Sequence, residues 1–426
     1  MLLRNCRFII TQNQKREILE NKDILIENGK VMEIGNVTEM GNNLSKKDEF
    51  IDCSDKIIIP GLINCHTHAA MNLLRGVSDD KNLQEWLNED IWPRETKING
   101  EFCYQGTLLA AGEMLLTGTT CFNDMYFHIG DVARAADKSG MRCFLGQVMF
   151  DFFDGEKTKK IIEDSESEIK KIIDLKNERI NPTVTPHSVE TCSDELLIQS
   201  RDLANKYNLL LHMHLSETEK EVTDCLKNRG KRPLILLDDL GLLKNKFIGA
   251  HGIHFNQEEI NLLNQNKFFI IYNPCSNAKL ASGICPAWEL KSLCIGTDSV
   301  ASNNNLNLFE EMKFGVLLQR VKYNDVSAMS TQRIFDSATI EGARALGIEN
   351  DVGSIEIGKK ADLGLIDKDN IFLNPNHNII SNLVYSFNGA VSDVIVEGEF
   401  AVRNKEIVNF DLEELIEKVE KFREIL

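Results

Sequence analysis

The chain has 426 residues, a formal net charge of -17 and a pI near 5.1. This length accommodates one large core and a smaller second one, such as a barrel of roughly 250 residues with an appended domain. The acidic balance argues against a nucleic-acid or anionic-membrane partner, because phosphate binding depends on clustered Lys and Arg side chains. A small or uncharged substrate is expected instead.

Cysteine usage and hydropathy indicate the compartment. The eleven cysteines are odd in number and form no paired framework, so a reducing cytoplasm is the expected location. Residues 1–10 include a short apolar stretch but no long signal-peptide core, and no run approaches the roughly 20 apolar residues of a membrane span. We therefore expect a soluble, cytoplasmic protein.

Both ends of the chain predict short β-strands. In residues 1–56, the Asn28-Gly29 dipeptide separates two apolar-rich runs, which is a strong hairpin signal. Similar apolar-rich runs separated by turn residues occur in 353–366 and 393–402. These patterns predict one small β-sandwich built from both termini, residues 1–56 together with 350–410.

The last residues, 411–426, form a separate predicted element. Apolar side chains recur there at helical spacing, which predicts an amphipathic C-terminal helix. We expect this helix to pack on its own domain, and the alternative is that it supports a homo-oligomer.

The middle of the chain, residues 57–349, alternates between strand-like and helix-like segments. Helices are predicted near 101–117, 129–139, 156–176 and 193–207. Eight strands are predicted near 57–65, 119–125, 142–148, 181–187, 209–214, 247–251, 268–273 and 293–298. This count and rhythm predict an α/β fold, a (β/α)₈ barrel that carries the catalytic site.

Polar residues fall repeatedly at the carboxyl ends of these predicted strands. They are His66 and His68 after the first strand, His187 after the fourth, His214 after the fifth, His251 after the sixth and Asp298 after the eighth. The carboxyl face of a (β/α)₈ barrel carries its chemistry, so these side chains predict one shared site.

Each of these residues also has a simpler interpretation. His66 and His68 share one face of a strand and could grip one ion, although a lone His-x-His is often structural. Cys65 points to the opposite face and reads as a small buried residue rather than a ligand. His212 shares a strand face with His214 and competes for its role, and Asp298 could be a helix N-cap. Together, three imidazoles and one carboxylate predict a site for Zn²⁺ or Fe²⁺ with a position left for water.

Several segments carry a pattern that extends beyond the histidines: 60–68, 71–76, 214–218, 250–254, 273–277, 296–304 and 358–363. Together they resemble the amidohydrolase superfamily. Within it they are most similar to 5-methylthioadenosine/S-adenosylhomocysteine deaminases and the related aminohydrolases and chlorohydrolases. The likeness extends over nearly the whole chain and implies one divalent ion bound by His66, His68, His214 and Asp298.

The resemblance also implies Glu217 and His251 as proton-transfer groups. A divalent ion lowers the pKa of its water, and the resulting hydroxide can attack a ring carbon that bears an amino group. His251 and Asp298 would orient that water and accept its proton, while Glu217 would protonate the neighbouring ring nitrogen. The simpler interpretation of Glu217 is a first-turn acid favoured by the helix dipole.

Substrate contacts follow from the same resemblance. It implies that Trp86 and Glu95 meet a ribose, that Glu95 accepts hydrogen bonds from its hydroxyls, and that His187 and Glu217 face the purine. The alternatives are a core aromatic for Trp86 and a solvated surface acid for Glu95.

One position departs from the family pattern. Gln147 stands where these deaminases usually carry an arginine, and glutamine cannot replace the arginine's charged fork. The chain would then prefer substrates without an amino-acid tail, unless Lys159 compensates.

These observations predict a metal-dependent deaminase of an adenine nucleoside or related aminopurine: 5-methylthioadenosine, S-adenosylhomocysteine or adenosine. A guanine or pyrimidine deaminase or a chlorohydrolase would use the same water activation. A noncatalytic scaffold predicts gaps among the ligands, and the sequence has none.

Overall fold

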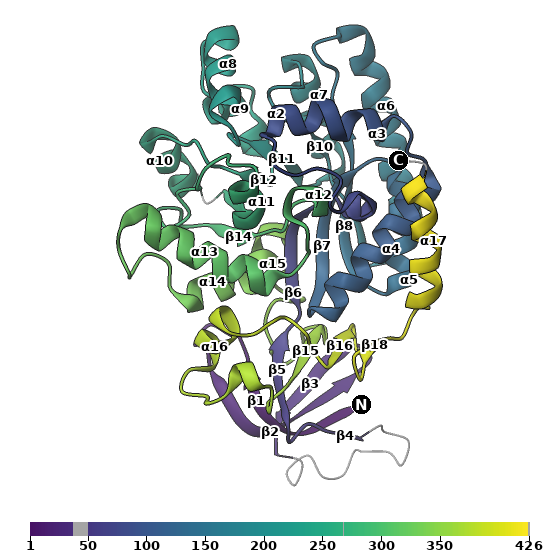
Figure 1. The fold of residues 1–426 in the computed structure, drawn as a ribbon, viewed down its shortest axis with the longest axis vertical. Coiled ribbons are helices and arrows are strands. Elements are labelled where there is room, and N and C mark those ends of the chain that lie inside the picture. The colour runs from purple at the N-terminus through teal and green to yellow at the C-terminus, as the bar shows by residue number, and fades with distance from the viewer. Residues whose placement is uncertain (37–49, 267, 425–426) are drawn as a thin grey trace.

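The barrel occupies the centre of the computed structural model, which describes residues 1–36, 50–266 and 268–424. Its parallel strands stand side by side in the upper half of Figure 1, with helices packed around them. The strands are β6 (Leu62–Thr67), β7 (Thr119–Tyr126), β8 (Arg142–Met149), β9 (Ile180–Pro182) with β10 (Thr185–Pro186), β11 (Leu211–Leu215), β12 (Phe247–His251), β13 (Phe269–Tyr272) and β14 (Leu293–Ile295). The predicted (β/α)₈ barrel is confirmed.

Two short bridges close the ring of strands. The first group runs β6, β7, β8 and β10, and the second runs β11, β12, β13 and β14. A bridge between Val184 and Leu211 joins the two groups at one seam, and a bridge between Thr67 and Asp298 joins them at the other. The second seam places Asp298 directly beside the end of β6.

The predicted strand at 57–65 is two strands. β5 (Lys56–Pro60) pairs with β1 and β15 of the terminal sheet, and β6 begins the barrel at Leu62. The chain changes direction at Gly61, where an added Cβ would lie 2.1 Å from Thr120 Oγ1, so a side chain has no room. The apolar run at 57–65 therefore predicts one strand, although its two halves belong to different sheets.

Several helices of the barrel begin where a side chain accepts from one of their first free N–H groups. Ser193 Oγ accepts from Leu196 N before α7, and Thr218 does the same for Glu221 N before α8. The helices are α4 (Gly100–Leu116), α5 (Ile129–Ser139), α6 (Gly155–Asp174), α7 (Asp194–Tyr207), α8 (Glu219–Arg229), α9 (Pro233–Asp239), α10 (Gln257–Asn266), α11 (Pro274–Lys279), α12 (Val300–Asn303), α13 (Leu308–Tyr323), α14 (Thr331–Ser337) and α15 (Ile340–Leu346). Short helical turns also occur at η1 (Ala69–Leu74) and η3 (Leu242–Lys244).

A helical segment between β6 and α4 crosses the carboxyl end of the barrel, and we call residues 82–95 the strap (Figure 1). It consists of α2 (Leu83–Glu85), the π-helical η2 (Trp86–Ile91) and α3 (Trp92–Glu95). Asn82 caps its start by accepting from Gln84 N and Glu85 N. The strap therefore covers the end of the barrel where the predicted site residues lie.

The two termini build one further sheet below the barrel, as predicted (Figure 1). Its order within the described residues is β18-β17-β16-β15-β5-β1-β2-β3, with β4 beside β1. Residues from β1, β2, β5, β15 and β16 share one apolar core. Its strands are β1 (Leu2–Ile10), β2 (Ile18–Glu27), β3 (Lys30–Gly35), β4 (Phe50–Asp52), β15 (Leu363–Asp367), β16 (Asp393–Val396), β17 (Glu399–Arg403) and β18 (Glu406–Ile407).

A buried ion pair joins this sheet to the barrel. Arg142 Nε, at the start of β8, lies 3.1 Å from Asp362 Oδ2, and both side chains are at least 95% buried. Asp362 Oδ1 also accepts from Glu397 N at 2.8 Å. The segment 358–363 therefore holds the two parts together rather than contributing to the catalytic end.

The predicted C-terminal helix is α17 (Leu412–Glu420), followed by the turn η5 (Lys421–Glu424). It packs along α4 and α5 of the barrel (Figure 1), where Leu415 contacts Leu108 and Ala135. A shorter helix, α16 (Ile379–Tyr385), follows the turn η4 (Ile371–Leu373). In the described part of the chain, every helix is too short or too polar to cross a bilayer.

Candidate active site

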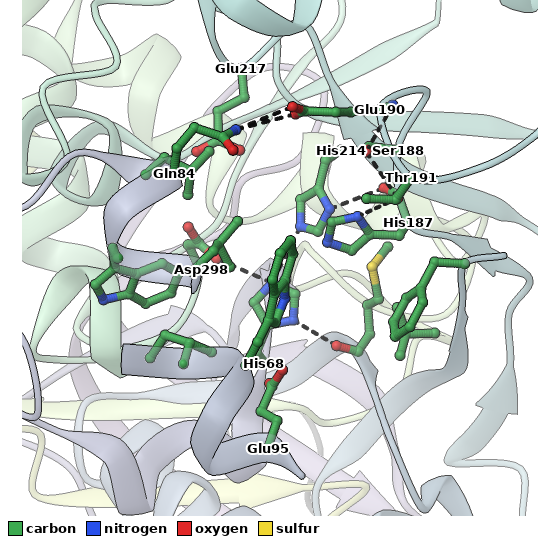
Figure 2. A pocket seen from close by; sticks show the side chains of 18 of the residues that line it. His68, Gln84, Glu95, His187, Ser188, Glu190, Thr191, His214, Glu217 and Asp298 are labelled. Carbon is green, nitrogen blue, oxygen red and sulfur yellow. Dashed lines mark hydrogen bonds and ion pairs between the residues drawn. The ribbon is translucent and has the colours of Figure 1, made fainter. Parts of the chain in front are cut away.

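Strand ends bring the predicted ligands to one point at the carboxyl end of the barrel. His66 Nε2 and His68 Nε2 lie 3.4 and 3.3 Å from Asp298 Oδ1. His214 Nε2 lies 3.3 Å from His68 Nε2. Figure 2 shows His68, His214 and Asp298 directed toward the same space. Residues from β6, β11 and the end of β14 therefore present four donor atoms to one centre.

The outer nitrogens of these histidines are occupied. His68 Nδ1 donates to Met125 O at 2.6 Å, and His214 Nδ1 donates to His187 O at 3.0 Å. These bonds leave the Nε2 lone pairs facing the centre, which is the arrangement of metal-binding histidines. His66 Nε2 is buried without a hydrogen-bond partner among the described residues, and this orphaned atom faces the centre. The donor set therefore fits a divalent cation.

The structure decides between the alternative interpretations of His212, Cys65 and Asp298. His212 Nε2 lies 2.9 Å from His66 Nδ1. His212 therefore orients the predicted metal ligand His66 instead of joining the donor set. Cys65 faces away from the centre and packs beside Gly342 of α15. Asp298 is not a helix N-cap, because Ser299 caps α12 and Asn307 caps α13.

Backbone strain accompanies the site. Ser216, His251 and Asp298 have φ values of 49°, 76° and 62°, in the left-handed region that non-glycine residues rarely adopt. Such strain persists only where surrounding structure enforces it, and it is concentrated at functional sites. Here it lies at the ends of β11, β12 and β14, the strands that supply the centre.

Burial separates the protonation states of the acids. Burial raises the pKa of Glu217 well above its ordinary value, and the nearby Asp298 charge raises it further. Burial would also raise the pKa of Asp298, but the adjacent His66 and His68 imidazoles outweigh it and hold that pKa well below the usual range. Two carboxyl groups with opposite pKa shifts in one site are suited to acid and base roles respectively.

The same environment keeps three of the imidazoles neutral, whereas at His68 the Asp298 carboxylate outweighs burial and raises the pKa. Burial lowers the pKa of His251 and of His187 to about 3 in each case, and it lowers the pKa of His214 well below the ordinary value. His251 Nε2 lies 3.6 Å from Glu217 Oε2, so the His251 ring and the Glu217 carboxyl group face each other. Neutral imidazoles can bind a cation or accept a hydrogen bond.

Glu217 precedes α8, so it is not a first-turn acid. The acids of that turn are Glu219 and Glu221, after the N-cap Thr218. Glu221 is buried, and its two carboxyl oxygens accept from Ser216 N at 3.0 Å and Glu217 N at 2.8 Å. Glu221 therefore fixes the backbone that carries Glu217.

A cavity of about 310 Å³ lies over the centre and under the strap. The predicted contact residues Trp86, Glu95 and His187 all line it, together with His68, His214, Glu217, His251 and Asp298. Most of the remaining surface is apolar and aromatic: Met71, Leu83, Leu87, Ile91, Trp92, Met125, Tyr126, Phe127, Val148, Phe150, Phe152 and Leu280. Among the described lining residues there is neither lysine nor arginine.

Each predicted substrate contact has a defined neighbour. Glu95 is half-buried and accepts from Tyr126 Oη at 2.9 Å, so it is not a solvated surface acid. Trp86 is buried in the main core and also borders the cavity. His187 Nδ1 lies 2.8 Å from Thr191 Oγ1, so this hydrogen bond does not involve the other ring nitrogen, Nε2.

Gln147 and Lys159 do not belong to this cavity. Val148 lines it, and because strand side chains alternate, Gln147 on β8 faces the other side. Lys159 is exposed on α6 and lies 3.8 Å from Glu163. Any selectivity against an amino-acid tail would therefore come from a described lining without lysine or arginine, rather than from Gln147.

Four residues of the site were missed from the sequence: Tyr126, Glu221, Ser276 and Ser302. Tyr126 ends β7, so the carboxyl-end rule applied to the second strand would have found it. Ser276 and Ser302 lie within the segments 273–277 and 296–304 and donate to Asp298 Oδ2. Only their convergence in space reveals that role.

Residues 57–401 match the amidohydrolase family. The chain belongs to this family. The predicted family and the predicted hydrolase barrel are thereby confirmed, and family, geometry and donor set together support a divalent metal ion.

Curated relatives of similar length share more than two-fifths of its residues. A 5′-deoxyadenosine deaminase of Methanocaldococcus jannaschii is 44% identical over 416 residues, covering 96% of this chain and 97% of the relative. A 5′-deoxyadenosine deaminase of Methanococcus aeolicus is 43% identical over 406 residues, covering 94% of both chains.

Among solved structures, an adenosine deaminase from Xanthomonas campestris with bound zinc superposes with a TM-score of 0.92. It is 33% identical, and the match covers 99% of this chain and 97% of that one. Atrazine chlorohydrolase from Arthrobacter aurescens, at 22% identity and a TM-score of 0.88, shares the fold.

Proposed function

We propose that this chain is a metal-dependent deaminase of adenine nucleosides, with a substrate that has an apolar 5′ end, such as 5′-deoxyadenosine or 5-methylthioadenosine. The observation that carries the proposal is the meeting of three Nε2 atoms and Asp298 Oδ1 beside the buried Glu217, whose pKa is raised by burial. The relatives named 5′-deoxyadenosine deaminase support the same substrate class.

His66, His68, His214 and Asp298 would hold the ion, and we infer Zn²⁺ because imidazole and carboxylate donors suit it and the Xanthomonas relative contains it. When bound, such an ion supplies a water whose pKa is lowered toward neutrality. Asp298 would accept a proton from that water, and His251 would orient it. Fe²⁺ is the alternative ion for the same donors.

Proton transfer by Glu217 makes the purine susceptible to attack. Glu217 gives its proton to the ring nitrogen beside the amino-bearing carbon, so that negative charge does not build up there. A carbon–oxygen bond forms, and the carbon–nitrogen bond to the amino group breaks. The leaving amine takes the proton held by Asp298, and the new hydroxyl on the ring carbon gives its proton to Glu217, so one nucleoside and one water give the keto product and ammonia and both acids are restored.

The rest of the cavity would hold the nucleoside. Glu95 accepts from the ribose hydroxyls, Trp86 packs against the sugar, and His187 faces the purine. The aromatic and aliphatic lining suits an apolar 5′ group, and it offers no cation for a carboxylate tail.

Metal analysis and ammonia release from a substrate panel test the proposal. The panel contains 5′-deoxyadenosine, 5-methylthioadenosine, adenosine, S-adenosylhomocysteine, guanine and cytosine, with a chlorotriazine assayed for chloride. We expect about one metal per chain and the highest kcat/KM for the apolar 5′ nucleosides. Equal kcat/KM for S-adenosylhomocysteine and 5-methylthioadenosine would contradict a role in selectivity for the absence of lysine and arginine from the lining. Metal-free protein without turnover would favour a scaffold.

A further inference from the structure

Tyr126 joins the barrel to the strap inside the cavity. It is the last residue of β7 and only 2% exposed, and its hydroxyl donates to Glu95 Oε1 at 2.9 Å. Glu95 ends α3 in the strap, so the contact joins two elements of different origin. Figure 2 shows the carboxyl group of Glu95 below His68, directed into the cavity.

The contact occupies only one of the two carboxyl oxygens of Glu95. Oε1 is taken by Tyr126, and Oε2 makes no hydrogen bond to any residue that the structure describes. A carboxylate oxygen with free lone pairs at a cavity wall is suited to accept from hydroxyl donors of a ligand. Vicinal hydroxyls of a ribose are such donors.

Tyr126 also favours the charged form of that acid. Burial raises the pKa of Glu95, whereas the Tyr126 hydroxyl and the nearby His68 act in the opposite direction. Burial raises the pKa of Tyr126 well above its ordinary value, so its hydroxyl remains a donor at neutral pH. A Phe at this position would keep the ring but leave Glu95 without its partner.

We propose that Tyr126 is a positioning residue for ribose recognition: it binds one oxygen of Glu95 and so presents the other to the 2′ and 3′ hydroxyls of the substrate. This inference rests on the proposed nucleoside deaminase function. Selectivity for a ribose diol would then depend on Tyr126 and Glu95 together. Replacing Tyr126 would slow the deamination of substrates that have the diol much more than that of substrates that lack it.

The alternative is that Tyr126 only ties the strap to the barrel. The strap has a second such tie, because Gln84 Nε2 lies 3.3 Å from Glu190 Oε1, and Lys220 Nζ lies 2.9 Å from the same oxygen. A purely mechanical tie would act on every substrate that the strap covers. A positioning role acts only on substrates that have the hydroxyls.

The test compares two substrates in Tyr126→Phe: 5′-deoxyadenosine and its 2′,3′-dideoxy counterpart, which differ only in the diol. A lost hydrogen bond to a charged group lowers kcat/KM for 5′-deoxyadenosine by about ten-fold or more, and we expect the loss in KM. The dideoxy compound should change less than about two-fold. Glu95→Gln should show the same dependence on the diol.

Tyr207→Phe is the matched control, because its hydroxyl donates to Glu166 Oε1 at 2.8 Å in a Tyr–Glu pair far from the cavity. It should leave kcat/KM for both substrates unchanged. Metal content and Tm establish that each variant is folded and loaded. Equal losses on the two substrates in Tyr126→Phe would overturn the positioning role. Wild-type protein that releases ammonia from neither substrate would instead reject the proposed function.

Discussion

Ser276 Oγ donates to Asp298 Oδ2 at 2.6 Å, and this bond determines which oxygen of the aspartate faces the histidines. Ser302 Oγ donates to the same oxygen at 3.1 Å. Oδ1 therefore remains for the centre, within 3.4 Å of His66 Nε2 and His68 Nε2. The two serines come from α11 and α12, so they couple the ends of two barrel segments to one ligand.

The double variant Ser276→Ala/Ser302→Ala should weaken metal binding. Partners that orient a ligand typically contribute about 10- to 100-fold in metal affinity or activity. Zinc affinity measured by competition with a chelator should fall within that range. Ser200→Ala removes a buried hydroxyl that bonds only within α7, and it should leave the affinity unchanged. Wild-type affinity in the double variant would contradict the orienting role.

His68→Ala should lose the metal while the fold is retained. The side chain is one of four donors at the centre, and its removal leaves the strand and the surrounding core intact. Elemental analysis should find far less than one metal per chain, with an unchanged far-ultraviolet circular dichroism spectrum. His128→Ala, at an exposed turn before α5, is the control. Full occupancy in His68→Ala would exclude this residue as a ligand.

The carboxyl-end rule predicted most of the site, because it needs only strand positions. It predicted His66, His68, His214, His251 and Asp298 as neighbours, and the structure brings them together. It could not predict that Ser276 and Ser302 share one oxygen of Asp298. That contact depends on how the short helices α11 and α12 pack after β13 and β14, which leaves no periodic signal in the sequence.

The first predicted strand shows which feature of the fold the sequence pattern could not predict. Residues 57–65 form one apolar run, and hydrophobic pattern alone does not divide it. The division at Gly61 follows from a tertiary contact with Thr120, a residue some 60 positions away in sequence. Local pattern therefore predicts the number of barrel strands better than their ends.

Glu217→Gln should retain the metal and lose turnover. Glutamine keeps the size of the side chain but has no proton of comparable acidity to give to the ring nitrogen. Proton transfer of this kind contributes about 10²- to 10⁴-fold, and kcat should fall accordingly. Glu219→Gln, two residues later on the exposed start of α8, should behave like wild type. Normal kcat in Glu217→Gln, with normal metal content, would rule out the acid role.

Arg142→Met should destabilise the protein without altering the site. Arg142 is buried against Asp362, and removing one partner of a buried ion pair typically costs about 3–5 kcal/mol in the free energy of unfolding. Urea unfolding should show this loss, and metal content should stay normal. Arg134→Met, which breaks the exposed pair with Asp131, should cost less than about 1 kcal/mol. Equal effects of the two variants would contradict a joining role for the buried pair.

Glu311 predicts a defined pH dependence of stability. It is fully buried on α13, where it accepts from Cys275 N and Asn303 Nδ2, the neighbours of the two serines. Burial raises its pKa to about 8 from an ordinary 4.5. Between these values the folded state keeps a proton that the unfolded state has lost. Raising the pH should therefore lower the free energy of unfolding, by up to about 1.4 kcal/mol per pH unit from this group.

Glu311→Gln removes this titration, so its unfolding free energy should vary less with pH than that of the wild type. Urea unfolding at pH 5.5, 6.5 and 7.5 measures the difference, and the gap between the two proteins should narrow or reverse as the pH rises. Glu310→Gln changes the half-exposed neighbour on the same helix and serves as the control. Because other buried groups titrate equally in both proteins, they cancel in the comparison. Parallel curves for Glu311→Gln and wild type would mean that Glu311 is ionised in the folded protein throughout this range.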